Sequence, residues 1–226
     1  MTNDTTNPVL GILGVGYFAS YFTSSLRNGG YQGKIYLSPR NAQTAEKISK
    51  EHHCLIAQTN QDVIDKSEIV LLSVRPEQLP GLLESLAFRK DQIVITAVAG
   101  KTIAEHYAAA SHLPQTLVRM IPVCSIEAGE GVVPIYPPNP EVEKLANFTG
   151  TPISFDAEHD FDLALTTSCM NGWLYEFFGT MTNWLEEKGL PQDKARNIIL
   201  HNIRGATAYA LQKEDQKLVD ITNEIA

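Results

Sequence analysis

The 226-residue sequence has little of what several protein classes require. Its three cysteines, Cys54, Cys124 and Cys169, lie far apart and none belongs to a C-x-x-C pair, so neither a disulfide framework nor a cysteine-based zinc site is indicated. No Lys/Arg-rich run occurs and the net charge is −8, which removes the simplest electrostatic basis for binding nucleic acid. No stretch approaches the roughly 18 uninterrupted apolar residues of a membrane span. We therefore expect neither nucleic acid nor a membrane among the partners.

Two further absences concern metals and targeting. His52-His53-Cys54 has metal-binding residue types, but no second group of potential ligands elsewhere in the sequence would complete a site, so no metal is expected. The start of the chain, MTNDTTNP, is polar and lacks the apolar core of a signal peptide, which favours a cytoplasmic protein. The composition, 43% hydrophobic and 19% charged residues, is typical of a globular protein of one large or two modest domains.

Short apolar runs alternate with helical patterns from residue 8 to about 155. Dense runs such as Glu68–Val74 (EIVLLSV) are typical of strands buried on both faces of a parallel sheet. Strands are expected at 9–13, 34–38, 54–57, 68–74, 92–98, 116–120 and 131–135. Helices are expected at 17–28, from a cap at Asn41 to about Lys50, from Thr59 or Asn60 to about Asp65, and at 80–88. The alternation predicts an α/β domain over residues 8–155, with a mainly parallel, Rossmann-type sheet and helices on both faces.

After about residue 156 the strand patterns give way to helical ones. Apolar residues recur at helical spacing in two stripes separated by Gly189-Leu190-Pro191: Trp173, Phe177, Met181 and Trp184, then Ala195, Ile199, Ile203, Ala206 and Ala210. Two or three such helices rarely bury their stripes alone. We therefore expect residues 156–226 to form a small all-helical domain that contributes to the substrate site and pairs with a second copy of the chain as a homodimer.

A glycine motif lies where the first expected strand meets the first expected helix. Gly14-Val15-Gly16-Tyr17-Phe18-Ala19 matches G-x-G-x-x-G/A. The first glycine permits a tight turn, the second lets backbone N–H groups approach a pyrophosphate, and the small third residue lets helix and strand pack closely. The motif predicts a dinucleotide site at the helix N-terminus; the alternative is a tight turn without a ligand.

The end of the second expected strand indicates which dinucleotide binds. An NAD site has Asp or Glu there to hold the ribose hydroxyls, whereas this chain has Tyr36-Leu37-Ser38-Pro39-Arg40-Asn41. Ser38, Arg40 and Asn41 offer hydroxyl, guanidinium and amide donors, which suit a phosphate. We therefore predict NADP as the cofactor, with a solvated surface arginine as the alternative reading of Arg40.

The order of the motifs resembles that of the pyrroline-5-carboxylate reductase family over roughly residues 8–213. The segments are GILGVGYFAS, YLSPRN, LLSVRPEQL, ITAVAGKTI and RMIPVCSIEAGEGV. Three family motifs, A-V-K-P-Q, S-x-x-A-G and R-x-M-P-N, line the cofactor. The resemblance implies that the corresponding residues here do so: Ser73, Val74, Arg75 and Pro76, then Ala99 and Gly100, then Pro122.

The resemblance weakens where the family binds its substrate. Val123 replaces the asparagine of R-x-M-P-N, and the S-G-S/C-G-P-A-Y loop falls on 167–173, where most of its glycines are missing. Ser168 and Asn171 could still bind a carboxylate, with Val123 beside them. The family's helix threonine falls on Glu176, which could attract an iminium cation, and Thr167 is a second catalytic candidate. Helix capping or solvated side chains are the alternatives, the register could slip by two residues, and the chain ends at Ala226, before the family's T-P-G-G-T segment.

The function that the resemblance implies is NADPH-dependent reduction of 1-pyrroline-5-carboxylate to proline, the last step of proline biosynthesis, by hydride transfer to a C=N bond. Two alternatives stay open: a related NADP-dependent reductase of another cyclic imine or small carbonyl acid, and a non-catalytic NADP-binding protein. A serine hydrolase of the G-x-S-x-G type is excluded, because the motif does not occur.

Overall fold

The computed structural model describes residues 7–225 in two compact units, one ending at Thr166 and the other beginning at Thr167. Residues 1–6, which include most of the polar start of the chain, lie outside the described residues. The expected domain boundary at 155/156 falls before helix α7 (Glu158–Thr166), which the structure groups with the first unit. No helix within 7–225 is both long and apolar enough to cross a membrane.

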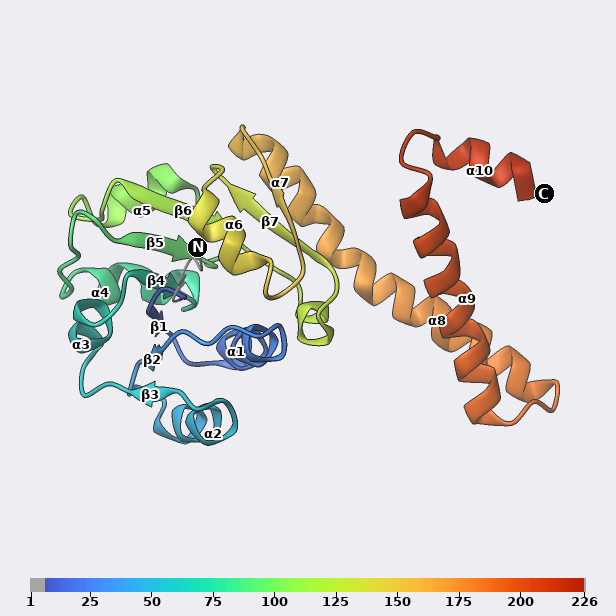
Figure 1. Ribbon diagram of the computed structural model, residues 1–226, viewed down its shortest axis with the longest axis horizontal. Coiled ribbons are helices and arrows are strands. Elements are labelled where there is room, and N and C mark those ends of the chain that lie inside the picture. The colour runs from blue at the N-terminus through green and yellow to red at the C-terminus, as the bar shows by residue number, and fades with distance from the viewer. Residues whose placement is uncertain (1–6, 226) are drawn as a thin grey trace, which may run out of the picture. The chain divides into compact units, whose positions relative to one another are not determined.

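The first unit is built on one eight-stranded sheet (Figure 1). The strand order is β3-β2-β1-β4-β5-β6-β7-β8, and all neighbours pair in parallel except β6 and β7. The strands are β1 (Leu10–Leu13), β2 (Ile35–Leu37), β3 (Leu55–Ile56), β4 (Ile69–Leu72), β5 (Ile93–Thr96), β6 (Thr116–Met120), β7 (Val132–Tyr136) and β8 (Thr151–Ser154). The predicted fold class, a mainly parallel Rossmann-type sheet followed by a helical segment, is confirmed.

Helices cover both faces of this sheet, so residues of the central strands find a buried apolar neighbour on whichever side they face. Successive side chains of a strand point to opposite faces. Ile12 accordingly belongs to a core that includes Phe22 from α1, and Leu13 to a second core that includes Val63 from α3. This double burial is why the central strands are continuous apolar runs. The covering helices are α1 (Tyr17–Asn28), α2 (Ala42–His52) and α6 (Pro140–Ala146) on one face, and α3 (Asn60–Asp65), α4 (Leu79–Leu83) and α5 (Ile103–Ala109) on the other.

The helix expected at 80–88 is shorter in the structure because a side chain from another element takes its later hydrogen bonds. A 3-10 turn, Pro76–Gln78, leads into α4, which ends at Leu83. The Gln61 amide donates to the Ala87 carbonyl at 2.8 Å and accepts from the Ala87 N–H at 2.9 Å. Both backbone groups of Ala87 are therefore held in a loop rather than in a helix.

A buried arginine ties α7 to the sheet. The side chain of Arg119, on β6, is 2% exposed and lies 2.8 Å from carboxylate oxygens of both Glu158 and Asp162. Its guanidinium also lies 4.5 Å from the centre of the Phe161 ring. The carboxylates and the ring come from α7, so this one side chain fixes the helix against the sheet.

The second unit is helical, with a 3-10 turn (Thr167–Cys169) followed by α8 (Met170–Glu187), α9 (Gln192–Gln212) and α10 (Leu218–Ile225). Gly189, in the left-handed region at φ 91°, makes the break between α8 and α9, which pack against each other. Ala195 and Ile199 are buried, but α8 has no buried residue. Trp173, Phe177 and Trp184 are 71%, 54% and 51% exposed within the single chain.

Candidate functional site

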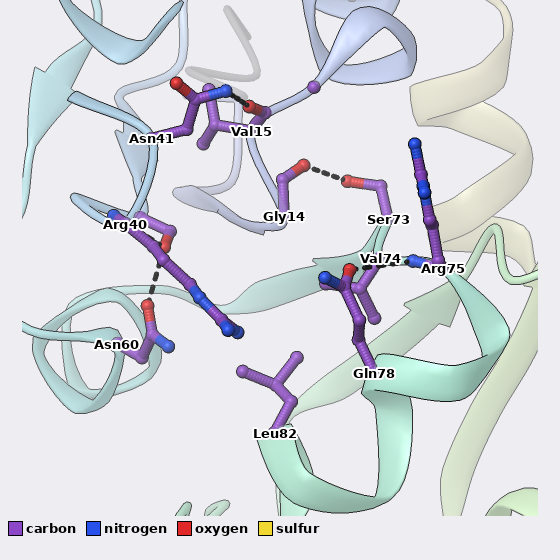
Figure 2. A pocket seen from close by; sticks show the side chains of 12 residues that line it. Gly14, Val15, Arg40, Asn41, Asn60, Ser73, Val74, Arg75, Gln78 and Leu82 are labelled. Carbon is purple, nitrogen blue, oxygen red and sulfur yellow. Dashed lines mark hydrogen bonds between the residues drawn. The ribbon is translucent and has the colours of Figure 1, made fainter. Parts of the chain in front are cut away.

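A cleft of about 350 Å³ opens at the carboxyl ends of β1, β2 and β4 (Figure 2). Ligands of open α/β sheets bind at this edge, where the strand order reverses, and here it reverses between β1 and β4. The cleft brings together eight predicted cofactor residues from three segments of the chain: Gly14, Gly16, Ser38, Arg40, Asn41, Ser73, Val74 and Arg75. Its other lining residues are Val15, Asn60, Gln78 and Leu82.

Gly14 makes the tight turn that ends β1. Its φ is +95°, and an added Cβ would lie 2.6 Å from the Ser73 carbonyl oxygen and 2.7 Å from Cγ1 of Val74. The Ser73 hydroxyl donates to the Gly14 carbonyl at 2.8 Å, which holds the turn against the end of β4. Only glycine satisfies both the backbone conformation and the space at this position.

Gly16 has a different surrounding, because no protein atom lies within 4 Å of a Cβ built on it. It lines the cleft and immediately precedes α1, whose first N–H groups have no partner in the helix. Ala19, in the first turn of α1, is fully buried. Tyr17 is 78% exposed and Phe18 packs against the core, and neither lines the cleft.

The end of β2 carries the residues from which the choice of NADP over NAD is predicted. Ser38 is 2% exposed, and its hydroxyl donates to Oδ1 of Asn60 at 2.6 Å. Asn41 is the N-cap residue of α2, as predicted, but its side chain makes no capping hydrogen bond: its amide instead donates to the Val15 carbonyl at 3.1 Å. Asn41 thereby ties the end of β2 to the glycine turn.

The cleft is locally cationic in a chain of net charge −8. Its lining contains Arg40 and Arg75 and no Asp or Glu. Both arginines are exposed, and within residues 7–225 neither has a carboxylate within salt-bridge distance. The volume, the N–H groups of α1 and the two free cations fit a phosphate-bearing dinucleotide.

Sequence reasoning missed Asn60, Gln78 and Leu82 as lining residues. Asn60 follows β3, the neighbour of β2, so the rule that carboxyl ends of adjacent parallel strands meet could have found it. Gln78 accepts from the Arg75 N–H at 3.4 Å across the 3-10 turn that Pro76 begins. No sequence signal distinguishes Gln78 or Leu82 from other surface-turn and core residues.

Of the remaining cofactor candidates of the first unit, Pro76 begins the 3-10 turn after β4 and does not line the cleft. The others follow β5 and β6, the next strands along the same edge. Ala99 and Gly100 form an exposed turn after β5, with Gly100 at φ +70°. Pro122 is buried after β6, with Val123 beside it, and its carbonyl is 3.5 Å from the Tyr21 hydroxyl of α1. None of these residues lines the cleft.

The other substrate candidates lie in the second unit. Thr167 and Ser168 belong to the 3-10 turn, and Asn171 and Glu176 to α8. Ser168 and Glu176 are exposed and Asn171 is half-buried. The N-cap of α8 is Cys169, without a side-chain hydrogen bond, so capping of this helix does not explain the hydroxyls before it. The roles of these residues stay predictions.

Comparison with known proteins places the chain among reductases. Residues 9–100 match the family model described as NADP oxidoreductase coenzyme F420-dependent. The pyrroline-5-carboxylate reductase of Pseudomonas aeruginosa is 25% identical over 222 residues, covering 92% of this chain and 80% of the relative. That of Pasteurella multocida is 23% identical over 229 residues, covering 96% and 78%. The predicted resemblance to the pyrroline-5-carboxylate reductase family is confirmed.

Solved structures share the fold of these reductases. The pyrroline-5-carboxylate reductase from Coxiella burnetii matches with a TM-score of 0.82 at 19% identity, covering 98% of this chain and 86% of the other. The Plasmodium falciparum enzyme, solved with NADP bound, gives 0.79 at 18% identity over 98% and 85%. A reductive aminase from Aspergillus terreus in complex with NADPH gives 0.60 at 16% identity over 91% and 75%. The fold of this chain is therefore one on which NADP-dependent reductases are built.

Proposed function

We propose that this chain is an NADP-dependent oxidoreductase that transfers a hydride to a C=N bond, and that its substrate is 1-pyrroline-5-carboxylate, which it reduces to proline. The observation that carries the proposal is the cleft at the switch point. It combines the Gly14–Gly16 turn with Arg40 and Arg75 and contains no acid where an NAD site needs one. The two relatives whose alignments cover 92% and 96% of this chain are named as reductases of this substrate.

When bound, NADPH supplies the hydride. The chain's own residues bind and orient it: the N–H groups at the start of α1 receive the pyrophosphate, and Arg40 with the amide of Asn60 receives the 2′-phosphate. An imine that is already protonated needs no strong acid from the protein, so holding the two reactants in register is the main catalytic task.

The substrate residues follow from the resemblance rather than from the cleft. We propose that Ser168 and Asn171 bind the substrate carboxylate and that Glu176 and Thr167 face the imine, while Val123 stays a separate prediction of the first unit. Ser168→Ala and Asn171→Ala should raise KM for the imine acid and change kcat less, as expected for groups that bind ground state and transition state alike. NADPH affinity should stay constant in both variants; a loss of cofactor affinity instead would remove them from the substrate site.

The experiment that tests the proposal is a steady-state assay of NADPH oxidation with 1-pyrroline-5-carboxylate, with the product identified as proline. Two further imines are assayed for comparison: 1-pyrroline, which lacks the carboxylate, and 1-piperideine-2-carboxylate, which has a six-membered ring. Turnover of the five-membered imine acid with the highest kcat/KM is expected. NADPH binding without turnover of any imine would favour a non-catalytic NADP-binding protein.

A second candidate is a reductase of another cyclic imine or of a small carbonyl acid. The observation that favours it is the loss of most glycines from residues 167–173, the segment that corresponds to the family's substrate loop. The shared fold of imine reductases and reductive aminases agrees with such a change of substrate. A higher kcat/KM for another member of the panel would decide for this candidate.

We further propose that the chain is a homodimer formed through its second unit. The large apolar side chains of α8 that remain exposed within one chain, Trp173, Phe177 and Trp184 among them, form a surface that monomers rarely leave open. A second copy supplies matching helices, and a closed two-fold pair is the commonest oligomer.

A further inference from the structure

We propose that Arg75 is a second anion-binding residue of the cleft, and that it holds the pyrophosphate of the cofactor from the β4 side while Arg40 holds the 2′-phosphate. This inference rests on the proposed NADP-dependent function. It assigns a separate part of the cofactor to each of two arginines. It predicts that one arginine sets affinity for both nicotinamide cofactors and the other sets the choice between them.

The sheet topology places the backbones of the two arginines on opposite sides of the glycine turn. Arg40 follows β2 and Arg75 follows β4, and β1 with its glycine turn lies between these strands. Adjacent strands are about 4.8 Å apart, so the ends of β2 and β4 are separated by about 10 Å. Figure 2 shows Arg40 and Arg75 on opposite sides of Gly14, with Ser73 next to Arg75. NADP carries two separate anionic groups, the pyrophosphate and the 2′-phosphate, and we assign one of them to each arginine.

The backbone of Arg75 is held in a fixed relation to the glycine turn. The Ser73 hydroxyl bonds the Gly14 carbonyl at 2.8 Å, two residues before Arg75. Pro76 then starts the 3-10 turn, and the Arg75 N–H donates to Gln78. Both ends of this short segment are anchored, so the arginine emerges beside the place where α1 begins.

The chemistry of the cleft leaves Arg75 as the cation available to the pyrophosphate. Ser73, Val74, Gln78 and Leu82 are its neutral companions on the β4 side. Arg119, the next arginine at this end of the sheet, is already paired with Glu158 and Asp162. A guanidinium presents five N–H donors in a planar fork that matches phosphate oxygens. The N–H groups of α1 bind the same group from the β1 side.

The test measures dissociation constants of the full chain for NADPH, NADH and adenosine 2′-monophosphate, in the wild type, Arg75→Gln, Arg75→Lys and the matched control Arg40→Gln. Adenosine 2′-monophosphate contains the 2′-phosphate and no pyrophosphate. Arg75→Gln should weaken NADPH and NADH by the same factor, about ten- to a hundredfold, the scale of hydrogen bonds to a charged group. It should leave adenosine 2′-monophosphate unchanged. Arg40→Gln should weaken NADPH and adenosine 2′-monophosphate and leave NADH unchanged.

Three outcomes would overturn the inference: Arg75→Gln leaves both dinucleotides unchanged, it weakens NADPH alone, or it raises only KM for the imine acid, which would make Arg75 a substrate ligand. Arg75→Lys keeps the charge without the fork and should give an intermediate loss. Unchanged thermal unfolding of the ligand-free variants excludes misfolding, since Arg75 is exposed. These binding measurements need no turnover. A wild type that binds NADPH through Arg75 but reduces no imine would support the inference and refute the proposed function.

Discussion

At the scale of single residues, the hydrogen bonds that each side chain of the cleft already makes determine which donors are left to bind a phosphate. The Ser38 hydroxyl has one hydrogen and donates it to Asn60, while Asn41 donates to Val15. Sequence reasoning treats Ser38, Arg40 and Asn41 alike, because all three offer donors at the right distance from the glycine motif. The structure uses the one hydrogen of Ser38 and one of the two amide hydrogens of Asn41, whereas no partner is found within residues 7–225 for the Arg40 guanidinium or the Asn60 amide nitrogen. This difference favours Arg40 and Asn60 for the proposed 2′-phosphate contact, and it depends on a neighbouring strand, so no motif contains it.

Substituting Asn60 by Asp tests this assignment. The variant keeps the oxygen that accepts from Ser38 and replaces the amide donor by a second carboxylate oxygen. We expect NADPH to bind about tenfold more weakly, because the carboxylate repels the 2′-phosphate. NADH should bind at least as well as before, since a carboxylate there can accept from ribose hydroxyls. Fluorescence titration of both cofactors measures this, and equal losses for the two would place Asn60 away from the 2′-phosphate.

The two glycines of the turn should respond to substitution in opposite ways. Gly14→Ala combines a positive φ with a Cβ 2.6 Å from a backbone oxygen, so the free energy of unfolding should fall by roughly 1–3 kcal/mol or more. Gly16→Val places its side chain in open space, so unfolding should change by no more than about 1 kcal/mol. Cofactor binding should nevertheless be lost in Gly16→Val. Chemical denaturation measures the loss of stability, and NADPH titration measures the loss of binding. Normal NADPH binding by Gly16→Val would show that the loop is a turn without a role in cofactor binding.

At the scale of elements, the sequence predicts what is locally determined. β1, β4 and β5 are dense apolar runs, and α1 lies between Gly16 and Gly29, so both are visible in the sequence. Helix α5 and helix α6 were not predicted, although Thr102 with Glu105 and Asn139 with Pro140 are start signals, because seven residues show no clear apolar period. The last strand, β8, is a mostly exposed edge strand without the apolar run that marks the others. The early end of α4 depends on Gln61, a contact that only the tertiary structure reveals.

A buried histidine makes α5 sensitive to pH. Nδ1 of His106 lies 2.7 Å from the Thr102 carbonyl, and Nε2 lies 2.8 Å from the Thr96 hydroxyl. These partners assign a neutral ring that donates from Nδ1 and accepts at Nε2. Burial, helped by the charge of Arg119, lowers the pKa of His106 below its usual value.

The stability of the fold should therefore decline in mild acid. The unfolded histidine takes up a proton near pH 6.5, whereas the folded one resists it, so its contribution is complete above about 6.5 and is lost as the pH falls toward the lowered folded pKa. His106→Gln should flatten this part of the curve. Urea unfolding between about pH 7.5 and 5.5 measures the slope, and identical slopes for wild type and variant would assign the pH dependence to other groups.

The anchoring of α7 gives a second element-scale prediction. Arg119→Met removes the buried partner of two carboxylates and should lower the free energy of unfolding by about 2–4 kcal/mol. Asp162→Asn changes a partner that is 47% exposed and should cost less than about 1 kcal/mol. Denaturation of both variants provides the comparison, and equal losses would contradict the view that burial of Arg119 carries the anchoring.

At the scale of the whole molecule, charge and apolar surface are distributed unevenly. A chain of net charge −8 keeps a cationic cleft free of acids, and its second unit leaves aromatic side chains exposed on α8. Composition alone reveals neither feature. The apolar stripes of the last 70 or so residues predict a partner for these helices, and this stays a prediction.

Assembly is tested by sedimentation at micromolar concentration. The wild type should behave as a dimer, and Phe177→Glu, which places a charge on the exposed face of α8, should shift it toward monomer. Asn183→Glu, at an exposed polar position of the same helix that lies off the apolar stripe, is the matched control and should leave the dimer intact. A monomeric wild type would contradict the proposed dimer without affecting the cofactor site.

The most direct test of the central claim follows the hydride itself. The chain is incubated with 1-pyrroline-5-carboxylate and NADPH that carries deuterium at the transferable position of the nicotinamide, and the product is analysed by mass spectrometry. The account predicts proline with one deuterium on Cδ, the ring carbon that formed the C=N bond, in proportion to the NADPH consumed. It predicts no product from Gly16→Val. NADPH that binds but remains unconsumed, with no labelled proline, would contradict it.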